Sequence, residues 1–302
     1  MDKGSKIFIV GHDDFVEGSL WKYFTDSGYL NVFSSSRMGM DPTIQATVFD
    51  FFQTYRPEYV FLFPTQSGGI GINQQRPADF IYHNLSSQDN ILYASWKFGV
   101  KKLLFYAPAC VYPKECVQPI KEEYLLTGRL EESSEPYAVA KIAGIKLCQA
   151  YRRQYGLNTI VVVPAALYGP GCDMNEQTGH VMGALIGKFK EAVVNHKSEV
   201  MVWGTGAPKR EFLYIDDFIG ACFFLMEQYD DEGIINAGSG QEVSIKELAQ
   251  TVAGVCGFKG KILFDETKPN GVPRKLLDSA RLKALGWKPR MSLKEGLMKA
   301  CV

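Results

Sequence analysis

The 302-residue chain is 46% hydrophobic and 22% charged, a globular composition that excludes disordered and fibrous classes. Basic and acidic residues balance at 33 each and no apolar run reaches ~18 residues, so we expect no nucleic-acid partner and no membrane span. The N-terminus lacks a signal-peptide pattern and the seven cysteines form no CxxC pair, so we expect a cytoplasmic protein with reduced thiols and no metal site.

The first half of the chain alternates short apolar runs with segments long enough for helices. The apolar runs lie at 6–10, 31–33, 59–63, 102–106 and 158–163, and the longest helical segments at 43–54, 78–98 and 137–155. Runs that are apolar throughout predict strands buried on both faces, as in a parallel sheet covered by helices. Because crossovers are right-handed, we expect an α/β fold with a doubly wound, Rossmann-type, mostly parallel sheet.

The alternation becomes less regular after residue 168. Glycine, proline, asparagine and aspartate crowd 169–179, and a helical stretch follows from 180 to about 194. Ser244 with Glu247, and Ser292 with Glu295, have the spacing of capping boxes that open helices. We therefore expect a Rossmann-type nucleotide-binding lobe at 1–165, to which part of 212–237 returns, and a smaller mixed α/β substrate lobe at 166–302.

Tyr137 and Lys141 are the first candidate catalytic pair. They are four residues apart in a predicted helix and so share one of its faces. A neighbouring ammonium favours the phenolate and lowers the pKa of the tyrosine, which suits proton transfer near neutral pH. An ordinary exposed helix can show the same spacing, so the pair gains weight from the nucleotide-binding pattern of strands before it.

Further motifs accompany this pair along the chain. They lie at 77–82, 110–114, 135–148, 167–170, 203–206, 210–213 and 268–278. Together they resemble the GDP-L-fucose synthases, a branch of the extended short-chain dehydrogenase/reductase family, over nearly the whole length. The resemblance implies an enzyme that epimerises GDP-4-keto-6-deoxy-mannose at C3 and C5 and reduces C4 with NADPH. It also implies a homodimer that pairs through the helices at 78–98 and 137–155.

The resemblance assigns roles on the substrate side. Cys110 and His180 match the family's two proton-transfer residues. Hydrogens beside a ketone are acidic because the carbanion becomes an enolate, so one group can remove a proton and another can deliver one to the opposite face. The positions that match contacts to the GDP-linked keto sugar are Lys188, Trp203, Arg210 and Asp278. The lobe at 166–302 is accordingly expected to bind mainly the GDP-sugar.

The cofactor side departs from the family's pattern. Gly11 keeps the first glycine of the dinucleotide loop, but Asp14 and Glu17 replace the other two, and their carboxylates are expected to repel phosphate. The segment 108–110 lacks the family's serine hydroxyl, and Arg37 is the one candidate for a 2′-phosphate contact. With Gly11 and Arg37 as remnants, we predict that NADPH binding is weak or absent and that no cofactor is used.

Three interpretations of the function follow. The favoured one is a GDP-4-keto-sugar epimerase acting at C3, C5 or both without hydride transfer, in which Tyr137 and Lys141 polarise the C4 carbonyl. The second is an NADPH-dependent epimerase-reductase, with NADP(H) as its cofactor. The third is a non-catalytic GDP-sugar-binding paralogue. Whether the sugar is a 6-deoxyhexose or a heptose stays open at this point.

Overall fold

The larger lobe is built on one parallel sheet. The computed structural model describes residues 1–11, 15–268 and 270–301. Six strands pair in the order β2-β1-β3-β4-β5-β9, and all five pairings are parallel. They are β1 (Lys6–Val10), β2 (Asn31–Ser34), β3 (Tyr59–Leu62), β4 (Lys102–Tyr106), β5 (Thr159–Pro164) and β9 (Ile234–Ala237). The predicted α/β class with a Rossmann-type parallel sheet is confirmed.

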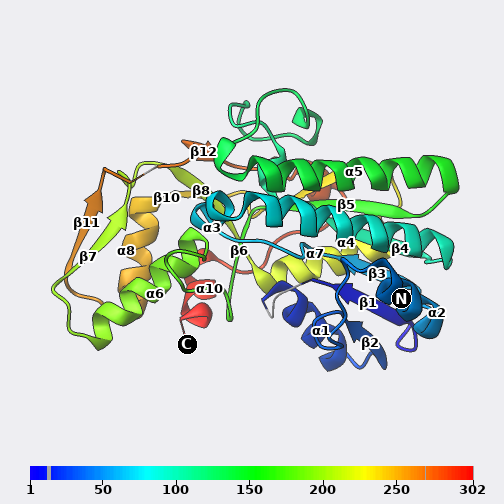
Figure 1. Cartoon of the computed structure of the whole chain (residues 1–302). Helices are drawn as coiled ribbons and strands as arrows, with labels where there is room; N and C mark the ends of the chain where they lie inside the picture. Colours follow the sequence, from blue (N-terminus) through cyan, green and yellow to red (C-terminus); the bar gives the residue numbers. More distant parts are fainter. Residues whose placement is uncertain (12–14, 269, 302) are drawn as a thin grey trace.

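Helices form layers on this sheet (Figure 1). Helices α1 (Val16–Asp26) and α7 (Ile215–Gln228) contact each other, whereas α4 (Pro77–Lys97) and α5 (Glu135–Tyr155) lie side by side, with α2 (Gln45–Tyr55) against α4. Strands β4 and β5 are buried along nearly their whole length. Strands covered on both faces need apolar residues at every position, which explains their continuous apolar runs.

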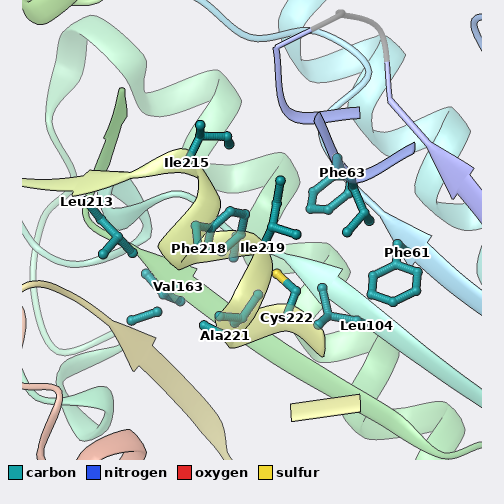
Figure 2. Close-up of a cluster of buried hydrophobic side chains, with 14 of the residues drawn as sticks. Phe61, Phe63, Leu104, Val163, Leu213, Ile215, Phe218, Ile219, Ala221 and Cys222 are labelled. Carbon is teal, nitrogen blue, oxygen red and sulfur yellow. The ribbon is translucent and has the colours of Figure 1, made fainter. Parts of the chain in front are cut away.

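Helix α7 attaches a later part of the chain to the sheet (Figure 2). Phe218 and Cys222 of α7 lie in a buried cluster with Phe61 of β3, Leu104 of β4 and Val163 of β5. Phe218 and Cys222 have no exposed surface. The strand that follows α7, β9, adds to the sheet beside β5. The segment from α7 to β9 thus belongs structurally with the first lobe.

The smaller lobe contains two small sheets (Figure 1). In the first, β8 (Lys209–Tyr214) pairs with β6 (Ala166–Tyr168), β10 (Glu242–Ser244) and β12 (Arg274–Lys275). In the second, β7 (Glu199–Trp203) pairs with β11 (Lys261–Asp265). The helices of this lobe are α6 (Val181–Val194), α8 (Ile245–Cys256), α9 (Ala280–Ala284) and α10 (Leu293–Ala300).

Local sequence signals account for several element boundaries. Both predicted capping boxes are present, with Ser244 opening α8 and Ser292 opening α10. Periodicity did not predict the short helix α3 (Ile70–Gln75) or the 3-10 turns η1 (Ala109–Val111), η2 (Glu122–Tyr124) and η3 (Glu132–Ser134). Segments this short have too few residues to display an apolar face. Among the described helices, none combines the length and the apolar character needed to cross a bilayer.

Candidate active site

The candidate site lies at the carboxyl ends of the parallel strands. The chain runs outward from β1 to β2 and then returns to place β3 on the other side of β1. Ligands of open α/β sheets bind beside such a reversal of strand order. The turn η1, which carries Cys110, follows β4 and packs against α5. Side chains after β1 and β4 and on α5 therefore converge at one edge of the sheet.

Tyr137 and Lys141 occupy the first two turns of α5. Tyr137 is 6% exposed, and its ring meets Phe80 edge to face at a centroid distance of 5.8 Å. Lys141 is 1% exposed, and its Nζ lies 4.1 Å from the centre of the Phe105 ring at the end of β4. An ammonium over a ring face is attracted by the π electrons, but far less than by a carboxylate or water. No described carboxylate forms an ion pair with Lys141, so the Phe105 ring offsets only a small part of the cost of burying its charge.

Burial shifts the proton affinities of this cluster. Burial lowers the pKa of Lys141 to about 7, while the nearby Cys148 and Cys110 thiols act to raise it. Burial also raises the pKa of Cys110, and Lys275, a hydrogen bond with Ser134 and the charge of Lys141 act to lower it. A lysine poised near neutrality is a candidate for proton transfer. Cys110 in turn needs these cations to become a thiolate.

Lys275 and Ser134 are site residues that the sequence reasoning missed. Burial lowers the pKa of Lys275, with Cys110 and Arg210 next among its electrostatic neighbours. Lys275 pairs directly with Arg210 in the β12–β8 register, so the two cations lie next to each other. Ser134 brings a hydroxyl to Cys110 from η3, although positions 108–109 lack one. Lys275 stands in the 268–278 motif, which was the available signal.

His180 and Lys188 belong to α6 and the loop before it. His180 is exposed and occupies the N-cap position of α6. Lys188 donates from Nζ to the Met201 carbonyl at 2.9 Å and forms an ion pair with Glu176 at 2.6 Å. Its Nζ also lies 5.6 Å from the Trp203 ring centre, and Trp203 is 43% exposed. The structure thus brings Lys188 and Trp203 together and adds Glu176, which no sequence motif indicated.

Arg210 and Asp278 have different surroundings. Arg210 donates to the Lys209 carbonyl at 2.8 Å and to the Asn270 carbonyl at 3.5 Å, and burial lowers the pKa of its guanidinium. The Asp278 carboxylate accepts from the Ala280 backbone N–H at 2.9 Å at the start of α9. It lines a cavity of about 400 Å³ with Lys121, Glu122 and Arg281 among others. From the 268–278 motif, the structure places Asn270 rather than Asp278 beside Arg210.

Glu17 lies buried at the carboxyl ends of β1 and β2. It is 1% exposed, and its Oε1 accepts hydrogen bonds from the Ser34 hydroxyl at 2.7 Å, the Ser35 hydroxyl at 3.2 Å and the Ser36 backbone N–H at 3.2 Å. The Gly11 N–H donates to the Ser35 hydroxyl at 3.2 Å. The Glu17 carboxylate therefore binds the end of β2 rather than facing the front of α1.

The remaining positions on the expected cofactor side are Arg37, Asp14 and the start of α1. The Arg37 guanidinium lies 4.1 Å from the centre of the Trp21 ring. Asp14, whose carboxylate entered the prediction about phosphate, lies outside the described residues. No described side chain caps the first turn of α1, which begins next to the carboxyl end of β1. A helix start in this position presents backbone N–H donors to an anion.

The fold and the site define an extended short-chain dehydrogenase/reductase, with a tyrosine–lysine pair at the carboxyl edge of a Rossmann-type sheet. Residues 7–238 match the NAD dependent epimerase/dehydratase family, and the chain belongs to it. It is 48% identical to GDP-L-fucose synthase 1 of Arabidopsis thaliana over 98% of this chain and 92% of the relative. The chain is therefore a GDP-sugar epimerase/reductase of the GDP-L-fucose synthase family.

Solved structures agree with this assignment. A GDP-6-OMe-4-keto-L-xylo-heptose reductase from Campylobacter jejuni superposes with a TM-score of 0.93 at 32% identity, covering 99% of this chain and 97% of that one. MlghC, a GDP-mannoheptose C4 reductase from the same organism with NADP bound, gives a TM-score of 0.89 at 34% identity, covering 99% and 98%. Both resemble the chain over its full length.

The prediction that no cofactor is used is wrong. A relative that matches 99% of the chain carries NADP, and the family as a whole is described as NAD dependent. The prediction relied on side chains, whereas a dinucleotide's phosphates are bound largely by backbone N–H groups at a helix start. It also assigned the Glu17 carboxylate to phosphate repulsion, but that carboxylate is bound by three donors from 34–36. Among the described residues, the Glu17 carboxylate is held at the end of β2 and is no ground for excluding a dinucleotide.

The comparisons also decide between the three interpretations. They favour the epimerase-reductase over the epimerase without hydride transfer that the sequence reasoning preferred. The doubt about reduction rested on the missing serine at 108–109 and on the glycine loop. Ser134 supplies a hydroxyl beside Cys110 from a different element, which local sequence comparison cannot reveal.

Proposed function

We propose that the chain epimerises a GDP-4-keto-6-deoxyhexose at C3 and C5 and then reduces its C4 ketone with NADPH. The observation that carries this proposal is the cluster of Cys110, Tyr137 and Lys141 at the end of β4, with Lys141 buried and its pKa near 7. Identity to the relative named for GDP-L-fucose is 48%, against 34% to the GDP-mannoheptose enzyme, which favours a 6-deoxyhexose over a heptose.

In the epimerisation, Cys110 acts as the base. Its thiolate removes the hydrogen from the carbon next to the ketone, and His180 delivers a proton to the opposite face. Lys275 and Lys141 are the cations that favour the thiolate. The Tyr137 hydroxyl donates to the C4 oxygen and stabilises the enolate that forms there. The same pair of groups serves C3 and C5, because both carbons flank the one ketone.

In the reduction, Tyr137 changes from a hydrogen-bond donor to an acid. Gly11 and Arg37 would help to hold NADPH, which would supply the hydride for C4. Tyr137 gives its proton to the C4 oxygen as that oxygen becomes a hydroxyl. Lys141 can return a proton to Tyr137 near neutral pH because its own pKa is about 7.

The nucleotide part of the substrate is assigned to the smaller lobe. Lys188 and Arg210 would bind the diphosphate, and Trp203 offers an exposed ring face to the base. Asp278, whose carboxylate accepts from the Ala280 backbone N–H, would act by holding the 268–278 segment in place. We further propose a homodimer that pairs through α4 and α5, where Tyr82 and Val139 are exposed, and a reducing, cytoplasmic setting for the thiols.

Isotope exchange with a cofactor assay tests the proposal. The protein is incubated with GDP-4-keto-6-deoxy-mannose in deuterated water, with and without NADPH. We expect deuterium at C3 and C5 in both cases, and stoichiometric NADPH oxidation in the second. Tyr137→Phe should reduce both signals, whereas Tyr23→Phe on α1, away from the site and from the proposed dimer contact, is the matched control. Exchange without any NADPH oxidation would contradict the reductase half, and no exchange would contradict the epimerase half.

A further inference from the structure

The loop at 169–180, which joins β6 to α6, packs directly against α6. The Asp173 and Met174 carbonyls lie against Gly183 and Gly187 of α6, where a Cβ would overlap them. Within the loop, the Asp173 carboxylate accepts from the Thr178 hydroxyl at 2.7 Å. The glycines thus let the loop backbone lie directly on α6. Side chains of the loop can therefore contact residues of α6.

One of those side chains is Glu176, which neutralises Lys188. Their ion pair measures 2.6 Å, with the Lys188 side chain 18% exposed and that of Glu176 42% exposed. The Lys188 ammonium also binds the Met201 carbonyl and faces the Trp203 ring. An ammonium has three N–H donors, and two of them have oxygen acceptors here, one of which is the Glu176 carboxylate. A phosphate oxygen that approaches Lys188 in this arrangement competes with Glu176, the carboxylate that pairs with this ammonium.

We propose that Glu176 is an internal competitor that a diphosphate must displace from Lys188, and that it sets the affinity of this site for diphosphates. This inference rests on the proposed function, since it takes Lys188 as a diphosphate contact. A diphosphate carries more negative charge than one carboxylate and wins the exchange, whereas an uncharged nucleoside gains nothing from Lys188. Glu176 therefore lowers the affinity for every diphosphate ligand and leaves nucleoside binding unchanged.

The same helix offers a matched control. Glu191 of α6 pairs with Lys197 at 2.7 Å, with side chains 61% and 49% exposed. Replacing Glu191 by glutamine removes the same charge as replacing Glu176. Glu191 lies near the C-terminal end of α6, and Lys197 has no ligand role in the proposed site. A general charge effect would alter both variants equally, and a local competition would alter one.

Calorimetric titration with GDP and with guanosine tests the inference. We expect Glu176→Gln to bind GDP about fivefold more tightly, the scale of one partly exposed ion pair, with guanosine affinity unchanged. Glu191→Gln should match the wild type with both ligands. In a Lys188→Met background, Glu176→Gln should have no effect on GDP. If Glu176→Gln does not fold, Glu176→Ala provides the same comparison.

Two results would overturn the inference. Equal GDP affinity of Glu176→Gln and wild type would show that no competition exists, and weaker binding would make Glu176 a ligand of the nucleotide. Failure of the proposed function looks different, because wild-type protein would then bind GDP no better than guanosine. An equal gain in Glu176→Gln and Glu191→Gln would reduce the effect to overall charge and would also contradict the proposal.

Discussion

Two buried charged side chains, Glu17 and Lys141, lie at the same edge of the sheet but differ in their hydrogen-bond partners. Glu17, at the carboxyl ends of β1 and β2, accepts three hydrogen bonds at one carboxylate oxygen. Lys141, on α5, lies against the Phe105 ring at the end of β4 with two thiols nearby, and its pKa falls to about 7. Hydrogen bonds to one oxygen offset part of the cost of burying the Glu17 charge, whereas a buried charge with no ion pair among the described residues is costlier and is kept where chemistry needs it. We call the surroundings of Glu17 the structural end of this edge and the surroundings of Lys141 the reactive end.

The largest expected effect falls on the reactive end. Cys110→Ser should slow deuterium exchange into substrate by about 100-fold or more, because a hydroxyl is much less acidic than a thiol. Burial raises the pKa of Cys110, so the wild-type exchange rate should climb as pH rises from neutrality and the thiolate fraction grows. Cys116→Ser is the control, since Cys116 is also half-buried and near Lys275. Equal rates for the two variants would remove Cys110 from the mechanism.

The second prediction concerns the cost of burying Lys141. The unfolded chain holds this proton up to a pKa of 10.5 and the folded chain only up to about 7. Stability therefore carries the full penalty below pH 7, and the penalty is relieved as pH rises towards 10.5. Lys141→Met should abolish activity yet raise the free energy of unfolding by about 3 kcal/mol at pH 7, with a smaller gain at pH 9.5. Urea unfolding at both pH values measures this.

Lys102 supplies the matched control for Lys141. It is buried to a similar degree, but its Nζ donates to the Leu225 and Met226 carbonyls and pairs with Asp230 at 3.0 Å. Lys102→Met should therefore lower stability by about 1–2 kcal/mol, because it leaves acceptors without a donor. If both methionine variants changed stability in the same direction, the distinction between satisfied and unsatisfied lysines would fail.

The third prediction addresses the structural end. Glu17→Ala removes the acceptor shared by Ser34, Ser35 and the Ser36 N–H, and should lower the free energy of unfolding by about 2 kcal/mol. Thermal and urea denaturation measure it, with the exposed Glu191→Ala as the control. A neutral or stabilising result would mean that the carboxylate, whose Oε2 has no hydrogen-bond partner among the described residues, is a strained remnant.

Sequence patterns predicted the fold well because burial on both faces leaves continuous apolar runs, as in β4 and β5. They also predicted that Tyr137 and Lys141 share one helix, since helical spacing is local. Patterns did not indicate Lys275, Ser134 or Glu176. Each of these reaches its neighbour across lobes or loops, and no spacing along the chain encodes a contact of that kind.

The cofactor prediction shows the limit of reading loops by residue type. Acidic residues in place of glycines suggested repulsion of phosphate. Whether a carboxylate repels a bound phosphate depends on the direction in which its side chain points. Glu17 follows β1 by only a few residues, yet its carboxylate is directed to the end of β2 by a run of serines. That run, 34–36, was available in the sequence as a set of donors. Its pairing with Glu17 required the parallel register of β1 and β2.

The smallest expected effect is the coupling between Glu17 and Ser35. The Ser35 hydroxyl lies within hydrogen-bond distance of Glu17 Oε1 and of the Gly11 carbonyl, at 3.2 and 3.1 Å, but it has one hydrogen to donate. Ser35→Ala should therefore lower stability by about 1 kcal/mol, and its effect should shrink by about 0.5 kcal/mol in the Glu17→Ala background. A double-mutant cycle by urea unfolding measures the difference. Full additivity would show that Ser35 serves Gly11 alone, which would leave Glu17 held by Ser34 and the Ser36 backbone.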